Sequence, residues 1–143
     1  MINWNAPILP GIGLGNLRLY SHISGFYPYL CKHEVKAKLL DKFLIRYEMK
    51  DFVDLWFNII NGKLVKITAL RNYSGKLFDT IQIGMPISEV LAIEPSFEYD
   101  EFEEIYCSSK GIYIEVDPDT KAVLWISVFV KEMECHEFEC GKW

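Results

Sequence analysis

The sequence predicts an α+β protein built on an antiparallel β-sheet, with a few short helices packed on one face of the sheet. Two observations carry this prediction. Short runs in which apolar and polar residues alternate are separated by turn-forming dipeptides, as in antiparallel hairpins. Only a few short segments have the spacing of amphipathic helices. Half of the 143 residues are apolar and 15% are aromatic, which is enough to build the core of a single domain, residues 1–143.

The first predicted hairpin spans residues 52–70. Residues 52–60 are almost continuously apolar, as expected for a central strand that is covered on both faces. Residues 64–70 alternate between apolar and polar side chains, as in a strand with one buried face. Asn61-Gly62 lies between the two runs and favours a type I′ turn, whose two central residues have positive φ.

The second predicted hairpin spans residues 112–130. Residues 112–116 alternate, and residues 123–130 are almost continuously apolar. The segment 117–120 separates them, with Pro118 in the second position of a turn, where proline is favoured.

The remaining elements are predicted from weaker patterns. Residues 86–93 form a helix that ends before a proline, and helices are also expected over 17–23 and 31–40. Residues 42–48 and 132–139 are expected to be strands, the second an acidic strand that protects a sheet edge from aggregation.

Two segments of the chain repeat the same order of elements. Residues 15–70 and 84–130 each begin with a glycine, continue through a helix and end in a hairpin. Two interpretations are open: two pseudo-duplicated helix–β-hairpin units within one domain, or two hairpins that are similar by chance.

Charge is distributed unevenly along the chain. The net charge is −5, but residues 1–76 carry a net +6 and residues 77–143 a net −11. Residues 77–109 contain eight acidic residues and no basic residue. An acidic field of this kind attracts basic partners and argues against direct binding of nucleic acid.

The segment 98–104 combines five carboxylates with two aromatic side chains. Aromatic residues anchor protein interfaces, and acidic residues around them steer a basic partner. The predicted partner-binding residues are Glu98, Tyr99, Asp100, Glu101, Phe102, Glu103 and Glu104. Two alternatives are a solvated acidic face and a carboxylate pair for acid–base catalysis, which would need a pocket.

Other residue types give no catalytic or metal-binding pattern. Cys31 and His33, and Cys135 with His136 and Cys140, lack the usual spacing of zinc ligands. Residues 11–15 are rich in glycine but do not match a nucleotide-binding loop. We therefore expect no cofactor, no metal and no enzymatic activity.

The sequence also predicts where the protein resides. No apolar run approaches the roughly 20 residues that a membrane-spanning helix needs. Residues 1–10 lack the basic and apolar regions of a signal peptide. A cytoplasmic protein with four reduced cysteines and no membrane contact is expected.

Residues 83–90 and the hairpin at 112–130 resemble a known repeat. They are similar to the helix-then-hairpin unit of beta-lactamase-inhibitor-like and outer-membrane-assembly lipoprotein-like domains, in Gly84, Ser88 and Glu89 among others. The resemblance covers about a third of the chain. The sequence departs from those families in lacking a lipobox and an export signal.

The chain as a whole resembles small cytosolic immunity proteins of bacterial polymorphic toxins, including contact-dependent growth inhibition systems. The similar features are Trp4, residues 10–15, residues 83–85 and the acidic, aromatic-rich composition. The resemblance implies a non-catalytic inhibitor that binds and neutralises a cognate toxin domain, often a basic nuclease. It implies no contact residues, because contacts differ from one toxin–immunity pair to another.

A second hypothesis is a small-molecule-binding or enzymatic domain. Its pocket would be lined by Trp56, Tyr73 and Trp125. A pocket with convergent polar groups would favour this hypothesis, and a broad acidic face would favour the inhibitor.

Overall fold

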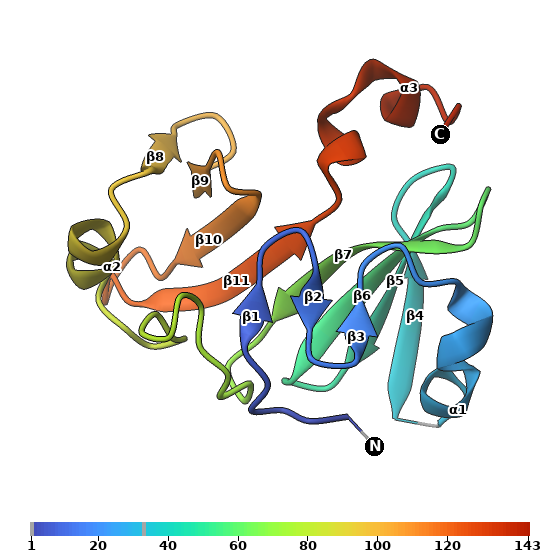
Figure 1. The fold of residues 1–143 in the computed structure, drawn as a ribbon, viewed down its shortest axis with the longest axis horizontal. Coiled ribbons are helices and arrows are strands. Elements are labelled where there is room, and N and C mark those ends of the chain that lie inside the picture. The colour runs from blue at the N-terminus through green and yellow to red at the C-terminus, as the bar shows by residue number, and fades with distance from the viewer. Residues whose placement is uncertain (1, 33) are drawn as a thin grey trace.

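Eight antiparallel strands form the main sheet, in the order β4-β5-β6-β7-β11-β10-β9-β8 (Figure 1). The computed structural model describes residues 2–32 and 34–143. The strands of the main sheet are β4 (Val35–Leu39), β5 (Leu44–Met49), β6 (Val53–Asn58), β7 (Lys63–Ala69), β8 (Phe97–Asp100), β9 (Ile105–Ser108), β10 (Ile112–Val116) and β11 (Val123–Phe129). A second, small sheet consists of β1 (Ile8–Leu9), β2 (Gly13–Leu14) and β3 (Leu17–Arg18). The helices are η1 (Ile23–Phe26), α1 (Tyr27–Leu30), α2 (Ile87–Ile93), η2 (Lys131–Glu134) and α3 (His136–Glu139), of which η1 and η2 are 3-10 helices.

The main sheet consists of two four-stranded meanders. Strands β4 to β7 form the first and β8 to β11 the second, and they meet where β7 pairs with β11. Helix α1 precedes the first meander and α2 precedes the second (Figure 1). The predicted fold class is therefore confirmed: an antiparallel sheet with short helices. The internal repeat stays a prediction. Each meander contains four strands, whereas the sequence predicts a single hairpin in each repeat.

The core lies on one face of the main sheet. In β6, Val53, Leu55 and Phe57 are completely buried, whereas Asp54 and Trp56 point to the opposite face and remain partly exposed. Ile67 of β7, Val128 of β11 and Ile112 of β10 lie side by side on the same buried face, because each strand pairs in register with the next. One face of the sheet is therefore apolar and the other is polar.

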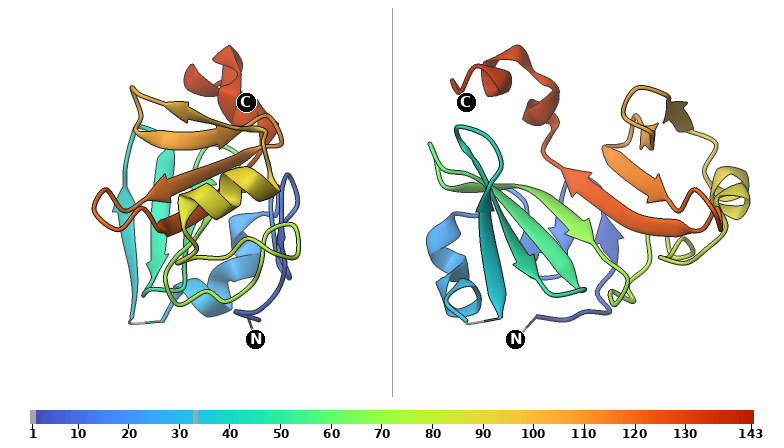
Figure 2. Two further views of the ribbon diagram at one scale, coloured as in Figure 1. Left: turned by 90° about the vertical axis from the view of Figure 1, so that its left-hand side faces the viewer. Right: turned by 180° about the vertical axis from the view of Figure 1, so that it is seen from behind.

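Short elements cover the apolar face. Ile8, Leu14 and Leu17 of the small sheet, Phe26 of η1 and Val90 of α2 are all buried in one continuous core. Figure 1 shows the small sheet in front of the centre of the main sheet. The view from behind shows the strands of the main sheet with no helix lying across them (Figure 2, right). We call this second side the open face.

The predicted turn at Asn61-Gly62 is present, but its type differs from the prediction. Asn58 pairs with Lys63, so the loop contains four residues, 59–62. The backbone N–H of Gly62 donates to the carbonyl of Asn58 at 2.7 Å, and Gly62 has φ +71°. Asn61 has no positive φ, which excludes the predicted type I′ turn.

The predicted turn at 117–120 is confirmed and is held by an aspartate. Oδ1 of Asp117 accepts hydrogen bonds from the backbone N–H groups of Asp119 (2.8 Å) and Thr120 (3.0 Å). These bonds lower the pKa of the Asp117 carboxyl group. Helix α2 also confirms its prediction, at residues 87–93.

Two predicted helices are strands or turns instead. Within 17–23, residues 17–18 form β3, and the backbone N–H of Leu19 donates to the carbonyl of Ile12 rather than into a helix. Within 31–40, residues 35–39 form β4, which pairs with β5 along its whole length. In both segments, pairing with a neighbouring strand overrides a weak helical pattern.

The predicted acidic strand at 132–139 is helical instead. It folds into η2 and α3, and Phe138 inserts into the core with its ring centroid 5.7 Å from that of Phe43. The segment adds no strand to the sheet, so edge protection is not its role.

Candidate functional site

The predicted partner-binding segment lies in the β8–β9 hairpin. Strand β8 is the last strand of the sheet, so this hairpin forms its outer edge (Figure 1). Residues 97–100 belong to β8, and residues 101–104 form the loop to β9. The structure therefore brings all seven predicted residues into one exposed projection.

The loop of the hairpin is shaped by Asp100. Its Oδ1 accepts hydrogen bonds from the backbone N–H groups of Phe102 (2.9 Å) and Glu103 (3.1 Å). Glu104 then takes a left-handed conformation with φ +57°. This turn leaves Phe102 at the tip, where 92% of the residue is exposed to solvent. Asp100 is thus a structural residue of the loop in addition to being an acidic one.

The seven residues do not share one face. Register places Glu98 opposite Cys107 and Asp100 opposite Ile105, on the open side of the sheet. Tyr99 lies on the other side, where its ring contacts that of Tyr106 at a centroid distance of 5.0 Å. Of the two predicted aromatic anchors, Phe102 is free at the tip, and Tyr99 is half exposed on a flank.

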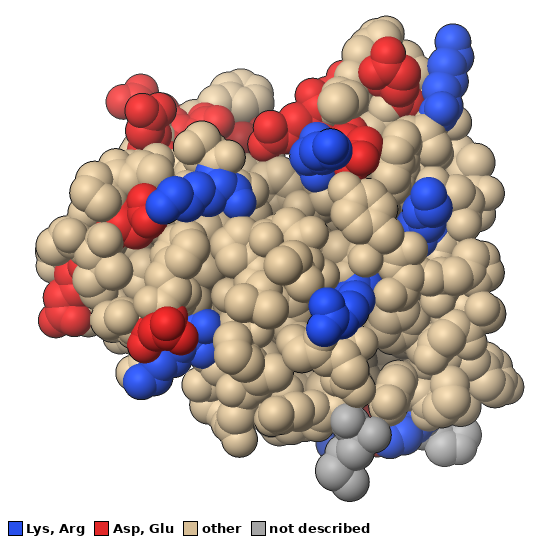
Figure 3. All heavy atoms as spheres, in the orientation of Figure 1, with Lys and Arg blue, Asp and Glu red and all other residues tan. Residues whose placement is uncertain are grey.

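Acidic side chains dominate this end of the molecule. None of the five carboxylates of the hairpin forms an ion pair with any described residue. Figure 3 shows one group of acidic side chains at the upper left, over the hairpin, and a second group along the top, over the η2–α3 segment. Burial, followed by the nearby carboxylate of Glu134, raises the pKa of Tyr113 to about 12.

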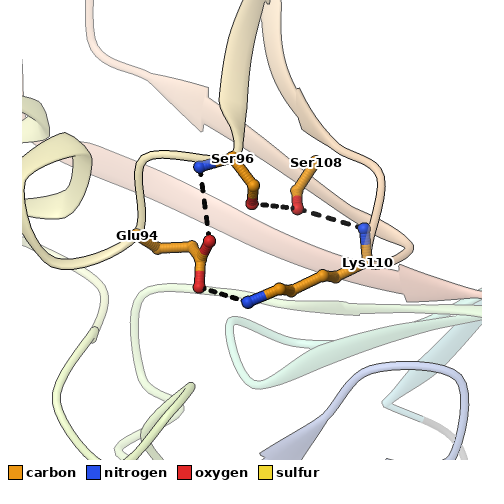
Figure 4. Close-up of polar contacts among 4 residues, drawn as sticks. All are labelled: Glu94, Ser96, Ser108 and Lys110. Carbon is orange, nitrogen blue, oxygen red and sulfur yellow. Dashed lines mark hydrogen bonds and ion pairs between the residues drawn. The ribbon is translucent and has the colours of Figure 1, made fainter.

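A polar network fixes the base of the hairpin. The Lys110 ammonium donates to Glu94 at 2.6 Å, and the two hydroxyls of Ser96 and Ser108 lie 2.6 Å apart (Figure 4). The hydrogen bonds from Lys110 and Ser96 lower the pKa of Glu94. The network ties the residue after α2 to the β9–β10 turn, so the hairpin projects from a fixed base.

The open face contains a cavity of about 230 Å³ that the sequence did not reveal as a whole. Its lining comes from strands β5, β6, β7, β9, β10 and β11. The lining residues are Arg46, Asp54, Trp56, Lys66, Thr68, Ile105, Tyr113, Glu115, Trp125 and Ser127. Apart from Trp56 and Trp125, the sequence does not indicate which residues line the cavity, because their contacts depend on the order of the strands.

The pocket predicted from Trp56, Tyr73 and Trp125 is only partly formed. Trp56 and Trp125 both line the cavity of the open face. Tyr73 is buried on the opposite side of the sheet, and its hydroxyl donates to the carbonyl of Ala6 at 2.6 Å. Two of the three predicted residues therefore share a cavity, and the third belongs to the core.

Charged groups in the cavity are perturbed by burial. Lys66 lies above the ring of Trp56, with Nζ 4.3 Å from the ring centroid, and burial lowers the pKa of its ammonium group. Burial also raises the pKa of Asp54 to about 6, although Arg46 and Lys66 act in the opposite direction. Thr68 and Ser127 also line the cavity, and their buried hydroxyls are hydrogen-bonded to each other at 2.8 Å.

The structure also places the cysteine, histidine and glycine groups that the sequence singles out. Cys140 contacts His136, with Sγ 3.3 Å from Nε2, but no metal-ligating group of three is found within residues 2–32 and 34–143. His33 lies outside the described residues. In the loop 11–15, a side chain on Gly13 would meet the carbonyl oxygen of Leu17, so this backbone is packed against β3 rather than open to a phosphate.

The comparisons with known proteins indicate a fold but no family. No protein-family model matches the chain, and no curated protein matches its sequence. The crystal structure of a cysteine-rich secretory protein from Staphylococcus aureus subsp. aureus Mu50 is similar, with a TM-score of 0.56 and 15% sequence identity. The similarity covers 92% of this chain and 50% of that protein, so the chain spans half the length of its structural relative. In the described part of the chain, no helix combines the length and the apolar character needed to cross a bilayer. At this level of identity, the likeness establishes a shared fold and nothing about activity.

Proposed function

We propose that this protein is a non-catalytic inhibitor that binds a basic protein domain through the β8–β9 hairpin. On the resemblance to immunity proteins, the partner is a cognate toxin domain with a basic surface, and inhibition takes place in the cytoplasm. The observation that carries the proposal is the exposed hairpin itself, an aromatic tip surrounded by carboxylates without ion-pair partners among the described residues.

The physical argument has two parts. Carboxylates that are not neutralised within the protein attract a basic surface over a Debye length, and this attraction raises the association rate. Phe102 exposes nearly all of its side chain, and burial of such a ring against a partner slows dissociation. A surface that holds phosphates must be basic, so an acidic hairpin is complementary to a nuclease.

The rigid base of the hairpin also supports a binding role. The Glu94–Lys110 ion pair and the serine pair hold both ends of the β8–β9 hairpin in place. A projection that is ordered before binding loses less conformational entropy on association than a flexible loop does.

The first experiment identifies the partner and tests the hairpin together. The wild-type chain and the variant Glu101→Lys/Glu103→Lys/Glu104→Lys are immobilised and exposed to lysates of the source organism and its close relatives. We expect the wild type to retain one basic protein in stoichiometric amount, and the variant to lose it. Association with the purified basic domain, measured at low salt, should be at least about tenfold slower for the variant.

A matched control separates local from overall charge. The variant Glu34→Lys/Asp41→Lys/Asp119→Lys changes the net charge by the same amount, at three exposed sites outside the hairpin. It should associate at nearly the wild-type rate. Equal association rates for the wild type and the hairpin variant at low salt would show that the hairpin is not part of the interface.

Neutralisation is tested in cells. The identified basic domain is expressed from an inducible promoter, together with the wild-type chain or with Phe102→Ala. We expect the wild type to restore growth and Phe102→Ala to restore it less, because dissociation is faster. A basic partner whose expression is harmless, or whose toxicity the wild type does not relieve, would contradict the inhibitor.

A further inference from the structure

The main sheet ends in two edge strands, β4 and β8, each of which pairs with only one strand of the described chain (Figure 1). The backbone N–H and C=O groups along such an edge can pair with a strand of another molecule. Residues 36–39 of β4 are exposed, and so are Glu98 and Tyr99 of β8. Both edges are therefore accessible to a second protein chain.

The outward backbone groups of β4 belong to Ala37 and Leu39. At the end of this strand, the backbone N–H of Leu40 donates to the carbonyl of Leu44 at 2.9 Å. Along an antiparallel pair, successive residues direct their backbone groups alternately toward the partner strand and away from it. Because β4 and β5 pair without a bulge, Ala37 and Leu39 direct their N–H and C=O groups away from the sheet.

The two edges carry opposite charges on the open face. Lys38 lies on this face because it pairs with Arg46, which lines the cavity there, and Lys36 lies two residues earlier on the same face. Glu98 and Asp100 have the same spacing on β8, and they also lie on the open side. None of these two lysines and two carboxylates forms an ion pair with a described residue.

The opposite side of both edges is apolar. Leu39 lies on this side because it pairs with Ile45, and 60% of the leucine is exposed. Tyr99 lies on the same side of β8 and is 51% exposed. Large apolar side chains of neighbouring strands stabilise a sheet when they contact each other on one face. The β4 and β8 edges are thus complementary on both faces of the sheet.

Strand order determines how the two edges would meet. Every neighbouring pair in the eight-stranded sheet is antiparallel, so β4 and β8 run in opposite directions. A second copy in the same orientation, with its β4 beside β8, therefore continues the antiparallel sheet and keeps the open face on the same side. Pairing of β4 with β4, or of β8 with β8, on a common open face would place like charges opposite each other.

We propose that a second copy of this chain adds its β4 edge to the β8 edge, in a head-to-tail contact. The register that places Lys38 opposite Glu98 also places Lys36 opposite Asp100, and it brings Tyr99 against the apolar side of β4. Such a contact leaves one edge of each kind unpaired, so further copies add to the row. The inference does not rest on the proposed inhibition, because the contact needs no other protein.

Sedimentation velocity of the purified full chain tests the contact, from about 10 µM to about 1 mM, because one strand pair gives a small and weak interface. We expect the weight-average sedimentation coefficient to rise with concentration past the value of a dimer, and to rise less at high salt. A monomer at every concentration, or a plateau at the dimer, would overturn the proposal.

A charge exchange tests the register. Lys38→Glu and Glu98→Lys should each weaken self-association about 3- to 30-fold, because each places like charges opposite each other. An equimolar mixture of the two variants should associate like the wild type, because opposite charges meet again. Lys76→Glu and Asp119→Lys make the same charge changes at exposed sites outside both edges, and they should stay close to the wild type. A mixture that associates no better than its components would contradict the proposed register.

Ala37→Pro tests the backbone pairing. Proline is tolerated on an edge strand where the N–H faces solvent, so the variant should keep the β4–β5 pairing and lose one donor of the contact. We expect weaker self-association, with the spectral dispersion of the variant as the check on its fold. A folded variant that associates like the wild type would show that β4 does not pair, and the charge exchange decides the matter if the variant does not fold.

Discussion

Asp54 shows how a single residue of the open face responds to its position in the sheet. Its pKa rises from 3.8 to about 6, because burial penalises the carboxylate more than Arg46 and Lys66 stabilise it. In the unfolded chain the group ionises near its ordinary value. Between these two pH values the folded protein therefore binds more protons than the unfolded one, and stability falls as the pH rises.

Asp54→Asn removes this pH dependence. Relative to the wild type, the variant should gain unfolding free energy as the pH is raised from about 4 to above about 7. The gain should be on the order of 1 kcal/mol, because partial exposure of the group screens part of the shift. Urea unfolding of both proteins across this range measures the difference, with Asp119→Asn as an exposed control. A difference between variant and wild type that stays constant with pH would contradict the raised pKa.

At the scale of elements, sequence reasoning succeeded where alternation and turn chemistry agree. The β6–β7 and β10–β11 hairpins have both signals, and both are present. Strand β8 is a four-residue edge strand with two acidic residues, which has little of the composition that identifies strands. The helix expected over 17–23 does not form, because residues 17–18 belong to the small sheet. Leu17 and Leu19 pack in the core against residues that are distant in the sequence.

The loop between β6 and β7 predicts a specific weakness. Gly62 has φ +71°, and a Cβ added there would lie 2.4 Å from Nε2 of His22. Gly62→Ala should therefore lower the unfolding free energy by about 1–3 kcal/mol, from backbone strain and from displacement of the imidazole.

A double-mutant cycle separates the two causes. In a His22→Ala background, Gly62→Ala should cost only about 1 kcal/mol, because the strain remains and the clash is gone. Equal costs in both backgrounds would show that the imidazole moves aside freely. Circular dichroism during urea unfolding provides the measurement.

At the scale of the whole molecule, strand order decides what can be inferred from sequence. The hairpin residues 98–104 are contiguous, so composition alone identifies them as a segment. The cavity is lined by side chains from six strands. These side chains are adjacent because β7 (residues 63–69) pairs with β11 (residues 123–129). No local pattern in the sequence specifies that pairing. For this reason the pocket expected from the sequence includes Tyr73, although Tyr73 lies on the opposite side of the sheet from Trp56 and Trp125.

Strand order also predicts how stability is distributed. Strands β6, β7, β11 and β10 lie in the middle of the sheet and contain completely buried residues, whereas β4 and β8 are edges with mostly exposed side chains. Amide hydrogen exchange should be slowest in the central four strands and fastest in β4 and β8. Exchange followed by NMR under native conditions tests this order, and equal protection in β7 and β8 would contradict it.

The joining of two meanders by β7 and β11 has an electrical consequence. Residues 35–69 of the first meander carry a net +3 and residues 97–129 of the second a net −6, so the two halves of one sheet carry opposite charge. The molecule is thus a permanent dipole, and a basic body in its vicinity exerts a torque on it. It should turn as it diffuses, so that β8 and β9 lead, and salt should remove this orientation before it abolishes contact.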